Sequence, residues 1–283
     1  MSFKVIVDSC CDLTPSLLRE EDFLSVPLTI RVGDHVVVDD ASFDQADLLW
    51  RMKECETAPQ TSCPAPAQYL DAFACGADDL YVITLSALLS GSHNSAQQAR
   101  QLWLEEHPQA RVHIFNSCSA SAGEVLLALK VRELAAKGLP FQTVVSEATA
   151  FCTEMTTMFV LESLDNLRKN GRLTGLQSVV TGALRIKLLM GATPEGEIYK
   201  RGQAMSVKQA LSKMVEIMSK DAAHAGKLLA IAHCNCLERA FQLKEMVRKS
   251  CHFSDILITE TGGISTVYAN DGGIVVALSL IHI

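Results

Sequence analysis

The sequence predicts an α/β protein made of two domains, each built on a mainly parallel sheet. Short apolar runs rich in β-branched residues alternate with longer amphipathic stretches, which is typical of strands that alternate with helices. The length of 283 residues suits one large domain or two medium ones. Because the pattern of elements changes near residue 155, we expect an N-terminal domain over residues 1–155 and a C-terminal domain over residues 156–283.

Strands and helices are expected to alternate in the first domain. Buried apolar runs predict strands at residues 3–7, 80–85 and 112–115. Amphipathic stretches predict helices at residues 45–54, 67–73, 94–104, 123–136 and 141–151.

The second domain shows a different order of elements. Strands are predicted at residues 157–163, 228–234 and 255–260, helices at 164–175, 207–220 and 237–249, and a hairpin at 187–202. Pro194 to Gly196 supply the turn of that hairpin. The tail, residues 264–280, has a glycine-containing turn between two apolar runs.

Composition and charge exclude several classes of protein. With 48% hydrophobic and 20% charged residues, the chain is neither disordered nor collagen-like. The net charge of −7 and the lack of a Lys/Arg block argue against a nucleic-acid partner. No apolar run reaches the ~18 residues of a membrane-spanning helix, so no stable membrane insertion is expected. The first residues lack the layout of a signal peptide, so we expect a cytoplasmic protein.

The ten cysteines do not predict a metal site. They are scattered and form no C-x-x-C pair, so most are expected to be reduced, apolar fillers. His233, Cys234 and Cys236 lie close together after an apolar strand, but a metal site is the weaker interpretation of them. We therefore expect no metal and no cofactor.

Three hydroxyl-rich loops stand where strands end and helices begin. They are Thr61-Ser62-Cys63-Pro64, residues 89–96 (LSGSHNSA) and residues 116–121 (NSCSAS). Any one of them alone reads more simply as a helix cap, since Ser and Thr are usual N-caps. Together they carry more hydroxyls than caps need, and ligands of parallel α/β sheets gather at this edge. Hydroxyls without an accompanying Lys or Arg suit a single small acid group better than a polyphosphate.

Two other chemistries compete with acid binding in this crevice. No G-x-x-x-x-G-K-[ST] or G-x-G-x-x-G motif occurs, which disfavours nucleotide binding. A small-molecule hydrolase or transferase using Ser90 and His93, with an acid such as Asp8, remains an alternative. Ser90-Gly91-Ser92 is not a G-x-S-x-G elbow, however, and His93 at the start of a helix more often faces solvent.

The order and spacing of several motifs resemble those of the DegV family, the bacterial fatty-acid-binding group that includes the FakB subunits of fatty acid kinase. The landmarks are Asp8-Ser9, Pro27-Leu28, Thr61-Ser62-x-Pro64, Leu89-Ser90-Gly91-Ser92 with Ser95-Ala96, Asn116-Ser117, Leu164-x-x-Leu167-x-x-x-Gly171-Arg172, Lys187 and Arg201-Gly202. They run almost from one end of the chain to the other.

This resemblance implies a DegV-like fold in which a long-chain fatty acid lies in a tunnel between the two domains. Carried over to this chain, the carboxyl group of the acid is held by Thr61, Ser62, Ser90, Gly91 and Ser92, with Ser117 of the third loop beside them. The protein would have no catalysis of its own. It would present the acid to a separate dihydroxyacetone-kinase-like subunit, which phosphorylates it to acyl phosphate for phospholipid synthesis.

The chain departs from the family pattern at two places. Asn116-Ser117 stands where the family commonly has Asp-Ser. The family's C-terminal His-x-Gly-Pro-Gly motif is replaced by residues 267–273 (VYANDGG), so the usual histidine has no equivalent, and Tyr268 is the substitute hydrogen-bond donor.

Three basic residues near these motifs have competing interpretations. Arg172 and Arg201 either cap local structure or bridge to another domain or a partner, and we place neither in the ligand shell. Lys187, in an apolar strand, is expected to pair with an acid rather than to act in catalysis.

Overall fold

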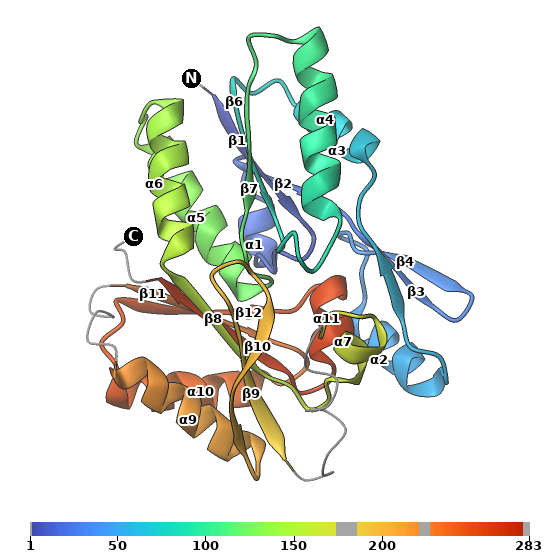
Figure 1. Ribbon diagram of the computed structural model, residues 1–283, viewed down its shortest axis with the longest axis vertical. Coiled ribbons are helices and arrows are strands. Elements are labelled where there is room, and N and C mark those ends of the chain that lie inside the picture. The colour runs from blue at the N-terminus through green and yellow to red at the C-terminus, as the bar shows by residue number, and fades with distance from the viewer. Residues whose placement is uncertain (1, 174–185, 221–226, 280–283) are drawn as a thin grey trace.

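Three β-sheets organise the chain in the computed structural model, which describes residues 2–173, 186–220 and 227–279. The sheets have four, six and three strands. In Figure 1 the first lies in the upper lobe, the second in the lower lobe, and the hairpin of the third, residues 29–38, projects at one side. The predicted α/β class is confirmed.

The four-stranded sheet is parallel throughout, as predicted for the N-terminal half. Its strands, in spatial order, are β2 (Phe23–Val26), β1 (Phe3–Asp8), β6 (Asp79–Thr84) and β7 (Arg111–Asn116). The four residues from Val5 to Asp8 at the end of β1 are all buried, because the sheet is covered on both faces.

Helices cover both faces of this sheet and confirm the predicted ones to within a few residues. They are α3 (Pro66–Phe73) and α4 (Ser92–Glu106) on one face, and α5 (Ala122–Ala136) and α6 (Phe141–Thr153) on the other. Because side chains alternate along a strand, Ile6 packs towards α3 and α4, whereas Val5 and Val7 pack towards α5. Helix α4 begins at Ser92, two residues before the predicted start, so Ser92 is a helix residue.

The six-stranded sheet corrects the prediction of a second parallel sheet. Its strands, in spatial order, are β10 (Ile198–Ala204), β9 (Lys187–Ala192), β8 (Met155–Val160), β13 (Ile274–Ser279), β11 (Leu228–His233) and β12 (Asp255–Glu260). Among its five pairings in the described residues, only β11–β12 is parallel. The hairpin β9–β10 and the insertion of β13 between β8 and β11 produce the antiparallel pairs, and burial alone does not reveal strand direction.

Helix α5 lies between the two large sheets and joins them into one core. Its apolar side chains, including Leu127 and Val131, pack against small residues of the second sheet: Ala230, Ala232 and Ala277. The opposite face of that sheet is covered by α9 (Val207–Lys220) and α10 (Leu237–Ser250). The two halves therefore share buried surface.

The third sheet was not predicted. It consists of β4 (His35–Val38), β3 (Thr29–Val32) and β5 (Gln60–Ser62), all antiparallel, and packs on α2 (Gln45–Glu54) and α11 (Gly263–Ala269). Its strands have only three or four residues each, too few to show a clear alternation, and β5 coincides with part of the first hydroxyl-rich loop.

Two short helices complete the described elements: α1 (Pro15–Leu18) and α7 (Asp165–Lys169). The helix predicted at residues 164–175 is thus shorter than expected, and it ends where Gly171 takes a φ of 74°. Residues 174 and 175 of that prediction, and Leu280 of the predicted tail, lie outside the described residues. The two apolar runs of the tail are α11 and β13.

Candidate functional site

An apolar pocket lies between the four-stranded and six-stranded sheets. It contains about 750 Å³ of space not filled by atoms, open solvent at its mouth included. The segments that follow β1, β6 and β7 contribute Cys10, Leu85, Leu89, Ser119, Ala120 and Ser121. The C-terminal half contributes Thr157, Phe159, Leu161, Leu167, Arg172, Ala192, Gly196, Ile198, Ile264, Ser265, Tyr268, Ala269 and Val275. The pocket thus lies at the carboxyl ends of the parallel strands, where a ligand is expected.

Most hydroxyl groups of the pocket wall already form hydrogen bonds with other groups of the protein. Ser119 and Thr157 share a hydrogen bond between their hydroxyl oxygens, 2.6 Å apart. Ser121 donates to the carboxylate of Asp12, and Ser265 donates to the carbonyl oxygen of Cys10. The surface that remains for a ligand is almost entirely apolar, so the wall suits a hydrocarbon.

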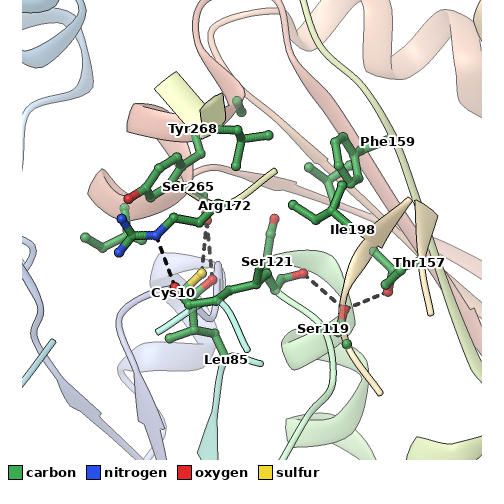
Figure 2. A pocket seen from close by; sticks show the side chains of 18 of the residues that line it. Cys10, Leu85, Ser119, Ser121, Thr157, Phe159, Arg172, Ile198, Ser265 and Tyr268 are labelled. Carbon is green, nitrogen blue, oxygen red and sulfur yellow. Dashed lines mark hydrogen bonds between the residues drawn. The ribbon is translucent and has the colours of Figure 1, made fainter. Parts of the chain in front are cut away.

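One end of the pocket is polar, and Figure 2 shows Tyr268 and Arg172 there. The Tyr268 hydroxyl is 2.7 Å from the Thr61 hydroxyl oxygen. The Arg172 guanidinium lies 5.7 Å from the centre of the Tyr268 ring and donates from Nε to the carbonyl oxygen of Leu89, at 3.2 Å. Burial raises the pKa of Tyr268, so its hydroxyl keeps its proton and can donate. We call Thr61, Tyr268, Arg172 and the Leu89 carbonyl the polar mouth.

Two further predicted residues, Ser90 and Gly91, lie in a surface hollow next to the polar mouth. Leu89 and Arg172 line both this hollow and the pocket. A Cβ atom added to Gly91 would come within 3.0 Å of the Cys63 sulfur, so the first and second hydroxyl-rich loops lie side by side. A larger residue at position 91 would require the Cys63 side chain to shift.

Of the predicted ligand residues, Tyr268 alone is among those that line the pocket, and Thr61 bonds its hydroxyl. The Ser62 side chain is exposed on β5. Ser92 is fully buried, where its hydroxyl donates to Asp8 at 2.5 Å and contacts the Tyr69 hydroxyl at 2.7 Å. Ser117 is fully buried too, and its hydroxyl bonds the backbone of Ser119. Ser92 and Ser117 therefore shape their loops and do not line the cavity.

Three carboxyl groups are buried at the carboxyl end of β1, behind the pocket wall. Burial raises the pKa of Asp8 to about 6 and that of Asp12 to about 7, against hydrogen bonds that favour their charged forms. Burial and the neighbouring Asp8 raise the pKa of Glu124 well above its usual range. These groups are mostly protonated in weakly acidic solution, so they add little charge behind the pocket wall there.

The geometry does not support the alternative that Ser90 and His93 form a catalytic pair. His93 Nδ1 lies 3.1 Å from the Thr84 hydroxyl, and Nε2 lies 3.4 Å from the Gln97 amide nitrogen. The Ser90 hydroxyl accepts from the Ser92 backbone N–H at 3.2 Å. Both imidazole nitrogens are thus occupied by neighbours other than the serine.

Arg172 is a pocket residue that the sequence analysis left out of the ligand shell. Its bond to Leu89 bridges the two halves of the chain, and it also donates from Nη1 to the Asn170 carbonyl at the end of α7, so it both bridges and caps. Lys187 pairs with the Glu162 carboxylate at 2.5 Å, as predicted. The apolar lining, such as Phe159 and Ile198, was also not singled out, because in sequence it looks like any buried strand. The signals that point to Arg172 are the Asn170-Gly171 turn before it and its place in the Leu164-x-x-Leu167-x-x-x-Gly171-Arg172 landmark.

Two other kinds of feature are absent from the part of the chain that the structure describes. None of its helices combines the length and hydropathy needed to cross a bilayer. Its His, Cys, Asp and Glu side chains form no cluster of three that could hold a metal ion, the His233–Cys236 segment included.

Similarity to known proteins extends over nearly the whole chain. A family model described as "Uncharacterised protein, DegV family" matches residues 2–280. A DegV domain-containing protein of Streptococcus pneumoniae is 38% identical over 286 residues, which cover 99% of this chain and 100% of the relative. A DegV domain-containing protein of Streptococcus gordonii is 36% identical over 282 residues, with the same coverage.

Solved structures with bound fatty acids share this fold. A DegV family protein of Ruminococcus gnavus, refined with vaccenic acid, is 46% identical with a TM-score of 0.94, and the match covers 98% of this chain and 99% of that one. The Streptococcus pneumoniae fatty acid kinase (Fak) B3 protein, loaded with linoleic acid, is 37% identical with a TM-score of 0.92, covering 99% and 100%. From its sequence and its structure alike, the chain belongs to the DegV family.

Proposed function

We propose that this protein is a carrier that binds one long-chain fatty acid without transforming it. The observation that carries the proposal is the apolar pocket between the two large sheets, with the polar mouth at one end. The acyl chain lies along the apolar wall, and the carboxyl group lies at the mouth. Relatives that are 46% and 37% identical were solved with vaccenic and linoleic acid, which supports this class of ligand.

The energetics fit a carrier whose affinity comes from the tail of its ligand. Each buried methylene contributes about 0.8 kcal/mol, so a C16 chain offers on the order of 12 kcal/mol before the costs of association. The mouth contributes selectivity, because an acid group buried without partners would cost several kcal/mol. The difference in binding free energy between the acid and a neutral analogue of the same length therefore measures how strongly the mouth recognises the carboxyl group.

For the head group we propose Thr61, Tyr268, Ser90 and Gly91 from the sequence prediction, together with Arg172. Ser62 is exposed on β5, so we place it at the rim of the site. Ser92 and Ser117 act indirectly, because both are fully buried in the networks that hold their loops.

We also propose the division of labour between the two parts of the chain. Residues 1–155 supply the hydroxyl-rich loops, and residues 156–283 cover the acyl chain through Phe159, Ile198 and their neighbours. Arg172 and Tyr268, both from the second part, complete the mouth. This division concerns the roles of the two parts and does not make them separate folding units, because α5 packs against both large sheets.

A separate kinase subunit of the dihydroxyacetone-kinase type is the partner that we propose. The support is the 37% identity, over the whole chain, to the pneumococcal Fak B3 protein. In this scheme the ATP chemistry belongs to the partner, and the carrier acts in the cytoplasm without a cofactor other than its bound acid.

Extraction of the protein as purified from cells tests the function directly. Mass spectrometry of the organic extract should show about one long-chain fatty acid per chain. Ala192→Phe, which fills the pocket, should lower that yield several-fold, whereas Ala67→Phe on the exposed face of α3 should not. An empty wild-type protein that hydrolyses model esters in a Ser90-dependent way would instead favour the enzyme.

A further inference from the structure

Two cysteines from distant parts of the chain meet behind the pocket wall. Cys118 lies in the loop after β7, half-buried, with a φ of 50°. Cys152, also half-buried, lies in the last turn of α6. Its thiol donates to the carbonyl oxygens of Ser117 at 3.2 Å and Asn116 at 3.5 Å, so its sulfur lies against the peptide that leads into Cys118.

The contact between the two thiols gives them different reactivities. The neighbouring Cys152 side chain lowers the pKa of Cys118 to about 7. The same contact and burial raise the pKa of Cys152. Cys118 is therefore partly ionised to the thiolate near neutral pH, with a protonated thiol beside it. Cys10 and Cys11 differ: both are fully buried, and burial raises their pKa values.

The Cys118 loop is also part of the pocket. The next three residues, Ser119 to Ser121, line the cavity. The Ser119 carbonyl accepts from the Ser86 backbone N–H at 2.7 Å. Gly196, in the turn of the β9–β10 hairpin, packs so closely that an added Cβ would come within 2.8 Å of Cys118 Cα. A displacement of the backbone at Cys118 therefore also moves the residues that form the pocket wall.

We propose that Cys118 and Cys152 form a peroxide-sensitive thiol pair, in which Cys118 is oxidised first and Cys152 closes a disulfide. The Cys118 thiolate attacks the terminal oxygen of a hydroperoxide. The O–O bond breaks, an alcohol or water leaves with a proton, and Cys118 becomes a sulfenic acid. The Cys152 sulfur then attacks the Cys118 sulfur, the S–O bond breaks, and water leaves with the Cys152 proton. The two thiols have lost two electrons in total, all of them to the hydroperoxide.

Closure of the disulfide draws the 117–121 loop towards α6 and loosens the hold on the acyl chain. This second part rests on the proposed function, whereas the disulfide itself does not. The bond restrains a loop whose backbone already packs against Ser86 and Gly196, so the wall has little room to adjust.

Peptide mapping of the full-length protein tests the pair without reference to any ligand. Trypsin releases Cys118 in residues 112–130 and Cys152 in residues 138–168, and each peptide contains one cysteine. After treatment of the native, reduced protein with equimolar hydrogen peroxide, we expect these peptides to be linked and to separate with dithiothreitol. Cys118 oxidised to the sulfinic acid with no linked peptide would overturn the proposal.

Variants assign the roles of the two thiols. In Cys152→Ser, a dimedone adduct should accumulate on Cys118, and in Cys118→Ser neither the adduct nor the link should form. Cys75, exposed at the end of α3, is the reference thiol, and Cys118 should react about three- to sixfold faster. Equal rates, or an adduct on Cys152 in place of Cys118, would contradict the assignment.

A binding measurement tests the coupling to the pocket. Oxidation of the delipidated wild-type protein should raise the Kd for a fluorescent fatty acid several-fold, and dithiothreitol should restore it. Cys152→Ser, treated in the same way, should show a smaller change. A linked protein with unchanged Kd would refute the coupling, and a protein that binds no fatty acid in either redox state would refute the carrier function, while the disulfide result would stand.

Discussion

The two ends of the pocket each contain a pair of hydrogen-bonded hydroxyls, yet only one pair is suited to a ligand. At the floor, Ser119 and Thr157 are 2.6 Å apart and both are buried. At the mouth, Thr61 and Tyr268 are 2.7 Å apart, are only partly buried and lie next to the Arg172 guanidinium. Figure 2 shows Thr157 and Ser119 together at one side of the pocket, away from Tyr268 and Arg172.

The difference lies in access and charge. The two floor hydroxyls bond each other and leave only apolar surface towards the pocket. The two mouth hydroxyls can exchange their mutual hydrogen bond for one to a ligand, and the Arg172 cation lies beside them. Arg172 is the one charged side chain among the described residues that line the pocket. Polar groups of the interior should therefore govern stability, and polar groups of the mouth should govern recognition of the acid.

The largest expected effect concerns Asp12, which holds Ser121 in the wall between the two ends. Its pKa is about 7 when folded, above the usual value of about 3.9, so the folded state keeps a proton that the unfolded chain has lost. The free energy of unfolding thus falls as pH rises through this window, by about 2–3 kcal/mol between pH 5 and 8 for this group. Asp12→Asn, which resembles the protonated form, should remove that contribution.

Urea denaturation of the delipidated protein at several pH values measures this difference between wild type and variant. Asp71→Asn, the same chemical change on the exposed face of α3, should leave the pH dependence of wild type unchanged. If the free energy of unfolding varies with pH in the same way for the wild type and Asp12→Asn, Asp12 is already ionised at pH 5. That result would contradict the view that polar groups of the interior govern stability.

The second effect sharpens the contrast at the mouth. Arg172→Gln should raise the Kd for a long-chain acid about 10- to 150-fold, because a hydrogen bond to a charged group contributes about 1.5–3 kcal/mol. The Kd for the alcohol of equal chain length should change little. Titration calorimetry with both ligands measures the difference, and Arg201→Gln on β10, which does not line the pocket, is the control. Equal losses for acid and alcohol would mean that Arg172 only supports the fold.

Sequence reasoning succeeded where the signal was local and periodic. The β1, β6 and β7 strands and the α3 to α6 helices were predicted because each apolar period is long enough to recognise. The direction of the strands in the second sheet and the short strands of the third depend on contacts between distant segments, which no local pattern encodes.

The site was predictable only in part, for the same reason. Hydroxyl-rich loops led to Thr61 and Ser90, but their chemistry also suits caps, and Ser92 and Ser117 proved to be buried in local networks. Arg172 ends one of the family landmarks, but its place at the mouth depends on contact with Leu89, 83 residues away in sequence. Tyr268 was found because a family motif was missing there, not because tyrosine itself signals a ligand.

The smallest effects compare the two hydroxyl pairs directly. Tyr268→Phe at the mouth should weaken binding of the acid by about 0.5–1.5 kcal/mol, the contribution of one hydrogen bond, and should change the unfolding of the empty protein less. Thr157→Val at the floor should do the reverse, because it leaves the buried Ser119 hydroxyl without its closest partner and costs stability while the apolar surface persists. Both variants are measured by the same two assays, calorimetry with the acid and urea denaturation of the delipidated protein. If the two variants lose affinity for the acid equally, the floor also contacts the carboxyl group. The acid would then bind with its carboxyl group at the floor, or in both orientations.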